Sequence, residues 1–148
     1  MVEAEVHVVV LPWYRQFYLL RGDVDWLSDQ ISPEGYERGL EAIDGFAYVR
    51  TTMYGNPTGV TARVHDAEPG PPDAEHDRVA EARLGGVGDV AARSWDPSEE
   101  PAGVIPLPRG PVHIRAAWYG MTEATGPPDC DLGGGDRSPE RLTIDFWP

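Results

Sequence analysis

Three aspartates in the stretch DCDLGGGD are candidates for binding a hard cation. Asp129, Asp131 and Asp136 lie close together in a glycine-rich segment with the composition of a loop. Carboxylate oxygens are the ligands that Ca²⁺ takes in proteins, but this spacing fits no EF-hand. The sequence leaves two interpretations open: a calcium or small-ligand site in a loop, or a solvated turn.

A second acidic stretch, DAEPGPPDAEHD at residues 66–77, has three prolines and no Arg or Lys. Clustered carboxylates of this kind can pair with a basic surface on another protein, and prolines limit the conformational freedom that is lost on binding. The alternative is a solvated loop whose charge serves solubility. Under the binding interpretation, the contact residues are Asp66, Glu68, Asp73, Glu75 and Asp77.

Residues for nucleophilic catalysis are not arranged in any recognisable pattern. The sequence has no Gly-x-Ser-x-Gly, and its four histidines do not have the spacing of metal ligands. Cys130 lies between two aspartates, whose negative charges disfavour the reactive thiolate. We therefore expect a protein that is not an enzyme and that carries no cofactor.

Length and charge narrow the class of protein further. A chain of 148 residues is expected to form a single domain, 1–148, and its net charge of −13 argues against nucleic acid as a direct partner. The longest apolar run, 8–13, is too short to span a membrane. One cysteine and a start without signal-peptide features favour the cytoplasm. The sequence does not distinguish a monomer from a dimer.

The elements that must position these residues are mostly strands. Val60, Ala62 and Val64 alternate with polar side chains, as in a strand with one buried face. The same alternation occurs at Val112–Tyr119 and at 142–147. Five further segments are predicted to be strands from their β-branched and aromatic content: 6–11, 14–20, 46–53, 78–84 and 87–95.

The strand at 14–20 is rich in aromatic side chains, and its two faces carry different sets. Tyr14 and Tyr18 share one face, whereas Phe17 shares the other with Leu19. Either one face is exposed and contacts a partner, or both faces are buried.

One short helix is expected, near residues 33–43. Ser32 can cap its N-terminus, Gly45 can end it, and its apolar face would consist of Tyr36, Leu40 and Ile43. About eight strands, separated by Gly- and Pro-rich turns, then indicate an all-β fold. We predict an antiparallel two-sheet β-sandwich with a jelly-roll or Greek-key path.

Four segments of the chain resemble the family of competence protein J, known as an inhibitor of a competence-associated nuclease. The resemblance is carried, in order, by YRQFYLL, YERGLEAIDGFAYVR, VIPLPRGPVHIRAAWYG and ERLTIDFWP. Residues 66–77 and the stretch GPPDCDLGGGD have no clear counterpart in that family, and the resemblance assigns no site residue.

The resemblance implies a small β-sandwich that acts by binding another protein. The resemblance also implies a basic partner such as a nuclease, because nucleases hold phosphates in basic clefts. Residues 66–77 would suit the role of contact surface for such a partner. The alternative interpretation is a calcium-dependent or small-ligand-binding sandwich that uses Asp129, Asp131 and Asp136.

Overall fold

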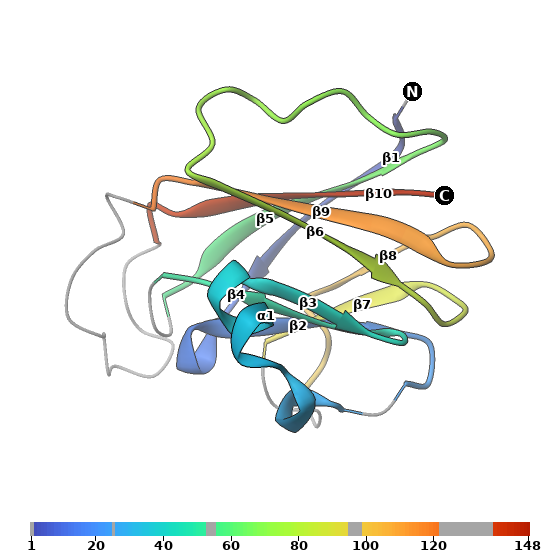
Figure 1. Ribbon diagram of the computed structural model, residues 1–148, viewed down its shortest axis with the longest axis horizontal. Helices are drawn as coiled ribbons and strands as arrows, with labels where there is room; N and C mark the ends of the chain where they lie inside the picture. The colour runs from blue at the N-terminus through green and yellow to red at the C-terminus, as the bar shows by residue number, and fades with distance from the viewer. Residues whose placement is uncertain (1, 25, 53–55, 95–98, 122–137) are drawn as a thin grey trace.

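The computed structural model is a sandwich of two five-stranded sheets (Figure 1). It describes residues 2–24, 26–52, 56–94, 99–121 and 138–148. The first sheet contains, in spatial order, β1 (Val2–Val10), β5 (Thr58–His65), β10 (Arg141–Trp147), β9 (Val112–Tyr119) and β6 (Arg78–Leu84). The second contains β3 (Leu40–Ile43), β4 (Phe46–Arg50), β2 (Gln16–Arg21), β7 (Val90–Arg93) and β8 (Gly103–Ile105).

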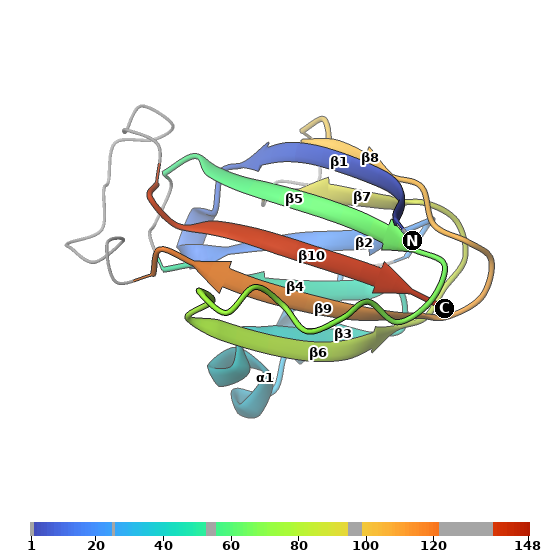
Figure 2. The same cartoon turned by 90° about the horizontal axis from the view of Figure 1, so that it is seen from above.

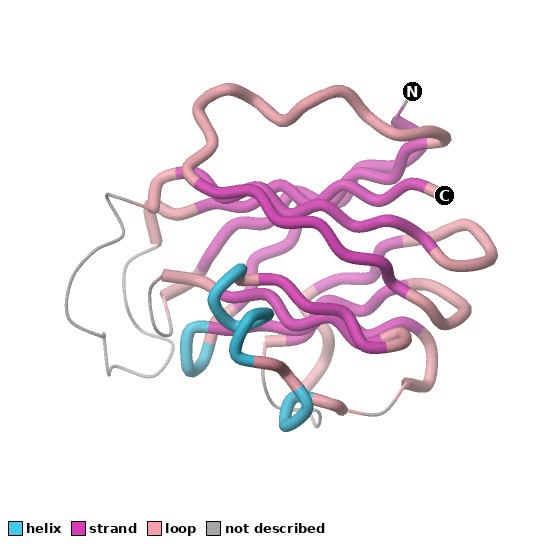
Figure 3. The backbone as a smooth tube through the Cα atoms, viewed as in Figure 1, coloured by secondary structure: helices cyan, strands magenta, loops and turns pink. Residues whose placement is uncertain are grey.

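The predicted all-β sandwich with one short helix is confirmed, with ten strands in place of about eight. The two additional strands are β3 and β8, which have four and three residues. Neighbouring strands are antiparallel except for β5 and β10, which run parallel. Figure 3 shows that strands fill both layers, while the helical turns lie outside them.

The helix is shorter than expected and gives way to a strand. Helix α1 (Pro33–Arg38) begins as predicted, with the Ser32 hydroxyl accepting a hydrogen bond from Gly35 N at 3.0 Å. It ends at Gly39, whose φ of 86° is left-handed, rather than at Gly45. Leu40 and Ile43 therefore belong to β3. Among the described residues, no helix has the length and apolar character needed to cross a membrane.

The main core lies between the sheets and is built by the predicted alternation. Val60, Ala62 and Val64 of β5 point inward, as do Leu142, Ile144 and Phe146 of β10. Trp118 of β9 is 1 % exposed, and its indole Nε1 donates to the carbonyl of Arg50 at 2.8 Å. This hydrogen bond joins the two sheets at one end.

Both faces of β2 are buried. Phe17 and Leu19 belong to the core between the sheets, whereas Tyr18 and Leu20 form a second cluster on the outer face of the second sheet. That cluster is covered by residues 24, 26, 27 and 31, which precede α1. Tyr14 is not part of the strand: it lies in the 3₁₀ turn η1 (Trp13–Arg15) and is exposed.

Candidate functional site

Residues 66–77 connect β5 to β6 by crossing the outer face of the first sheet (Figures 1 and 2). β10 and β9 lie between the two connected strands in the sheet, and the connection passes over them. We call residues 66–77 the acidic strap. The side chains predicted as contact residues are all exposed: Asp66, Glu68, Asp73, Glu75 and Asp77.

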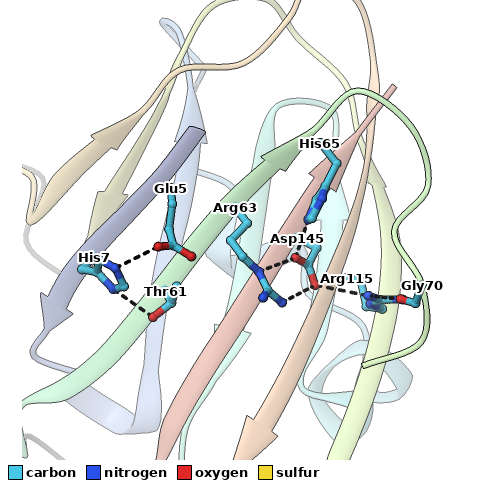
Figure 4. Close-up of polar contacts among 8 residues, drawn as sticks. All are labelled: Glu5, His7, Thr61, Arg63, His65, Gly70, Arg115 and Asp145. Carbon is cyan, nitrogen blue, oxygen red and sulfur yellow. Dashed lines mark hydrogen bonds and ion pairs between the residues drawn. The ribbon is translucent and has the colours of Figure 1, made fainter. Parts of the chain in front are cut away.

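Beneath the acidic strap, a buried aspartate lies between two arginines (Figure 4). Asp145 of β10 is in register with Arg63 of β5 and with Arg115 of β9, so the three side chains form a row across the outer face. Asp145 Oδ1 accepts a hydrogen bond from Arg63 Nε at 2.9 Å, and Oδ2 accepts one from Arg115 Nη2 at 3.3 Å. His65 Nε2 lies 2.7 Å from the same Oδ1. We call these four residues the Asp145 network.

The charge of Asp145 is maintained by its neighbours. Burial by itself raises the pKa of the Asp145 carboxyl, but hydrogen bonds from His65, Arg63 and Arg115, together with the charge of Arg63, lower that pKa below its ordinary value. The carboxyl is therefore a fixed negative charge at neutral pH, and it orients the two guanidinium groups.

Arg115 also attaches the acidic strap to the sheet. Its Nη2 donates to the carbonyl oxygen of Gly70, at the middle of the strap, at 2.8 Å. At the end of the strap, the backbone N of Asp77 donates to the Trp118 carbonyl at 2.8 Å, and Asp77 Oδ2 accepts from the backbone N of Met121 at 2.9 Å. The strap is thus held at its centre and at one end.

A pocket of about 360 Å³ lies between the strap and the sheet. Strap residues 69–73, which include the carboxylate of Asp73, line one side, and the sheet contributes Arg63, Arg115 and Arg141 together with His65. Among the described residues that line this pocket, none is a serine or a cysteine. The arrangement therefore offers electrostatic binding and no serine or cysteine nucleophile.

Along the strap, the predicted carboxylates lie on both sides of the uncharged residues 69–72. Asp66 and Glu68 precede these residues, whereas Asp73, Glu75 and Asp77 follow them. The carboxylate of Asp73 is also engaged within the strap, because its Oδ1 accepts a hydrogen bond from Glu75 N at 3.3 Å.

The predicted cation ligands Asp129, Asp131 and Asp136 lie outside the described residues, so the calcium site stays a prediction. In the described part of the chain, no group of three or more His, Cys, Asp or Glu side chains is placed to hold a metal ion.

The Asp145 network was not found by sequence reasoning. Its members occupy the polar positions of the alternating strands, which we expected to face water. The acidic strap covers that face instead, so His65 and Arg115 are each 6 % exposed. The sequence does show an Asp at a polar position of one strand and an Arg at a polar position of each of two others. These positions indicate a charged network only when the order of the strands in the sheet is known.

No protein-family model matches the sequence, and no curated protein matches it either. Two solved structures are similar over nearly the whole length of both chains. One is ComJ from Bacillus subtilis, described as an inhibitor of the DNA degrading activity of NucA; the TM-score is 0.67 at 16 % identity, covering 99 % of this chain and 98 % of that one.

The other solved structure is described as crocagin biosynthetic gene J, with a TM-score of 0.62 at 14 % identity and 98 % coverage of each chain. The resemblance to competence protein J that the sequence segments carry is therefore present in the three-dimensional structure. At these identities the similarity establishes a common fold.

Proposed function

We propose that this protein binds a basic partner protein through the acidic strap. The proposal is carried by one observation: five exposed carboxylates lie on a segment whose centre is fixed to the sheet by the Arg115–Gly70 hydrogen bond. A surface of this charge attracts a basic partner and speeds its association. Because the strap is held before binding, less conformational entropy is lost when the complex forms.

The partner that we propose is a nuclease, and the function is its inhibition. Nucleases bind the phosphates of DNA in basic clefts, and carboxylates placed along a strap can occupy such a cleft in place of phosphates. The fold is shared with ComJ, which inhibits the DNA degrading activity of NucA. On this proposal the chain acts by binding and catalyses no reaction.

The test compares two variants with the same change in charge. The strap variant replaces the five acidic residues by amides: Asp66→Asn, Glu68→Gln, Asp73→Asn, Glu75→Gln and Asp77→Asn. The control variant makes the same kind of change at five exposed acidic residues away from the strap: Asp29→Asn, Glu34→Gln, Glu37→Gln, Glu99→Gln and Glu100→Gln. Amides keep the hydrogen-bond acceptors, so the strap can retain its backbone contacts.

Wild type and both variants are used as baits in cell lysate at low salt, and the DNA-degrading activity of each captured fraction is assayed before and after release by high salt. We expect wild type and control to capture a nuclease that is inactive until it is released, and the strap variant to capture none. Equal capture by all three baits would remove the strap from the interface. Failure of wild type to capture any nuclease would remove the proposed partner class.

A further inference from the structure

A second, smaller pocket is lined by three arginines. These residues lie at the end of the sandwich where β4 and β9 end and β6 begins; Figure 1 labels the three strands. Arg15 and Arg50 come from the second sheet and the turn before it, and Arg78 comes from the first sheet. The pocket has a volume of about 150 Å³, and its other lining residues are Thr51, Thr52, Trp118 and Met121. We call it the arginine pocket.

Among the described residues, no carboxylate forms an ion pair with any of the three guanidinium groups. Arg50 instead lies over the Tyr36 ring, 4.4 Å from its centroid, and its Nη1 donates a hydrogen bond to the Tyr36 carbonyl at 3.4 Å. Arg78 lies 5.9 Å from the centroid of the Trp118 ring. Three positive charges around one pocket repel one another, and an anion bound between them would be attracted to all three.

Two carboxylates near the pocket are already engaged by other groups. The buried Glu140 interacts electrostatically with Arg50 and Arg78, but its oxygens accept hydrogen bonds from the backbone N and hydroxyl of Thr52 at 2.8 and 2.6 Å. Asp77 accepts a hydrogen bond from Met121 N. Neither acid lines the pocket, and together they do not balance three arginines.

Arg15 is brought to the pocket by an unusual turn. Tyr14 and Arg15 both have left-handed backbones, with φ of 58° and 62°, although neither is a glycine. The Arg15 carbonyl accepts from Thr51 N at 2.8 Å, which places the turn beside the end of β4. Backbone strain of this kind persists where the surrounding structure enforces it, and it is concentrated at functional sites.

We propose that the arginine pocket binds a phosphate-type oxyanion, either inorganic phosphate or the phosphate group of a small phosphomonoester. The planar guanidinium fork matches phosphate oxygens in geometry and charge. The pocket volume corresponds to about five water molecules, enough for one phosphate group, so an attached nucleoside would extend outside the pocket. This inference does not depend on the proposed protein partner.

The net charge of −13 does not prevent this binding. At physiological ionic strength, interactions between exposed charges are screened over a Debye length of about 8 Å. Asp77 is the strap carboxylate at the pocket, where it accepts a hydrogen bond from Met121 N, and one exposed carboxylate does not outweigh three half-buried arginines. The local charge determines which ions enter the pocket.

The test follows the indole N–H resonance of Trp118 by NMR, assigned from the spectrum of Trp118→Phe, because this ring lines the pocket. Inorganic phosphate, thymidine 5′-monophosphate and thymidine are added separately at constant ionic strength, with chloride as the balancing anion. We expect a saturating shift with phosphate, with the monophosphate or with both, which identifies the source of the anion. A shift with none of them, or an equal shift with thymidine, would overturn the proposal.

Two double variants then locate the site. Arg15→Gln with Arg78→Gln removes two cations from the pocket, whereas Arg83→Gln with Arg109→Gln removes two exposed cations outside it. We expect the first to weaken the phosphate affinity at least tenfold and the second to change it less than twofold; equal losses would indicate a general charge effect and refute the site. If the first variant does not fold, Arg78→Lys keeps the charge and loses the fork, and an affinity unchanged from wild type would refute the site as well.

Discussion

Asp145 determines how the side chains on the outer face of the first sheet are arranged. Its carboxylate is 1 % exposed and accepts hydrogen bonds from arginines on both neighbouring strands. Arg115 connects the same carboxylate to the acidic strap through Gly70. Removing the carboxylate would leave Arg115 buried without its counter-charge, which is more costly than losing a pair of exposed charges.

We expect Asp145→Asn to lower the free energy of unfolding by about 3 kcal/mol, with the cost arising mainly at Arg115, because Arg63 is partly exposed. Urea denaturation measures this difference. The matched control is Glu81→Gln, an exposed acid that faces Arg115 from β6, with an expected change below about 0.5 kcal/mol. Limited proteolysis should also cut the strap of Asp145→Asn faster than that of wild type; equal effects of the two variants on stability and cleavage would contradict this role.

Asp145 and Glu140 give the stability of the protein opposite dependences on pH. Because the pKa of Asp145 is lowered in the folded state, its ionised carboxylate stabilises the fold at pH values above 3.8, the ordinary pKa. This contribution is lost as the pH falls through the pKa of the folded state. Burial raises the pKa of Glu140, despite hydrogen bonds from Thr52 and the charges of Arg78 and Arg50, which lower it. The contribution of Glu140 to stability is fully present at pH values below 4.5, its ordinary pKa. It is lost as the pH rises through the pKa that Glu140 has in the folded state.

Glu140→Gln tests the second of these effects. The amide cannot ionise, so the Tm of the variant relative to that of wild type should rise as the pH increases from about 4 to about 8. Thermal melts at a series of pH values measure the difference. Thr143→Ser in β10, the strand that begins directly after Glu140, serves as a control without a change in charge. A difference in Tm that stays constant over this range would show that Glu140 ionises normally.

At the scale of elements, the end of α1 depends on one glycine. Gly39 has a φ of 86°, and a Cβ at this position would lie 3.1 Å from Trp118 Cζ2 and 3.1 Å from Arg78 Nη1. A side chain here is therefore disfavoured twice, by backbone conformation and by crowding.

We expect Gly39→Ala to lower the free energy of unfolding by about 1–2 kcal/mol from the backbone conformation alone, with crowding against Trp118 adding to it. Thermal and urea denaturation measure the loss. Gly70→Ala is the control, because a Cβ at Gly70 meets nothing within 4 Å and the backbone is not left-handed, so its effect should stay below about 0.5 kcal/mol. Similar losses in the two variants would argue against the crowding.

The strands were predictable from the sequence where alternation extends over many residues, as in β5, β9 and β10. β8 has three residues, too few to show a period. The apolar spacing of Tyr36, Leu40 and Ile43 predicts a continuing helix where the chain forms β3. The competing signal was Gly39, which ends the helix before Leu40 and Ile43.

The exposed carboxylates of the strap were predictable from composition. The Asp145 network and the arginine pocket were not, because their members come from strands whose order the sequence does not specify. The parallel pairing of β5 with β10 places Arg63 beside Asp145 across 82 residues of chain, and no local pattern contains that information.

For the whole molecule, the distribution of charge is as important as its amount. The net charge is −13, yet both pockets described above are lined by three arginines. The acidic strap lies over one of these pockets and presents its carboxylates to the solvent. A basic partner approaching this face therefore meets the carboxylates first, while Arg115 beneath them holds the strap through the Gly70 carbonyl.

This distribution predicts how the proposed complex forms. The association rate constant of wild type with its nuclease should fall at least about tenfold between 50 and 500 mM NaCl, because salt screens the attraction that guides the encounter, whereas the dissociation rate should change less. The strap variant should associate slowly at every salt concentration. The control variant has the same net charge as the strap variant and should nevertheless retain most of the salt dependence. Surface plasmon resonance separates the two rate constants, and identical salt dependences for the two variants would mean that total charge, and not the strap, guides association.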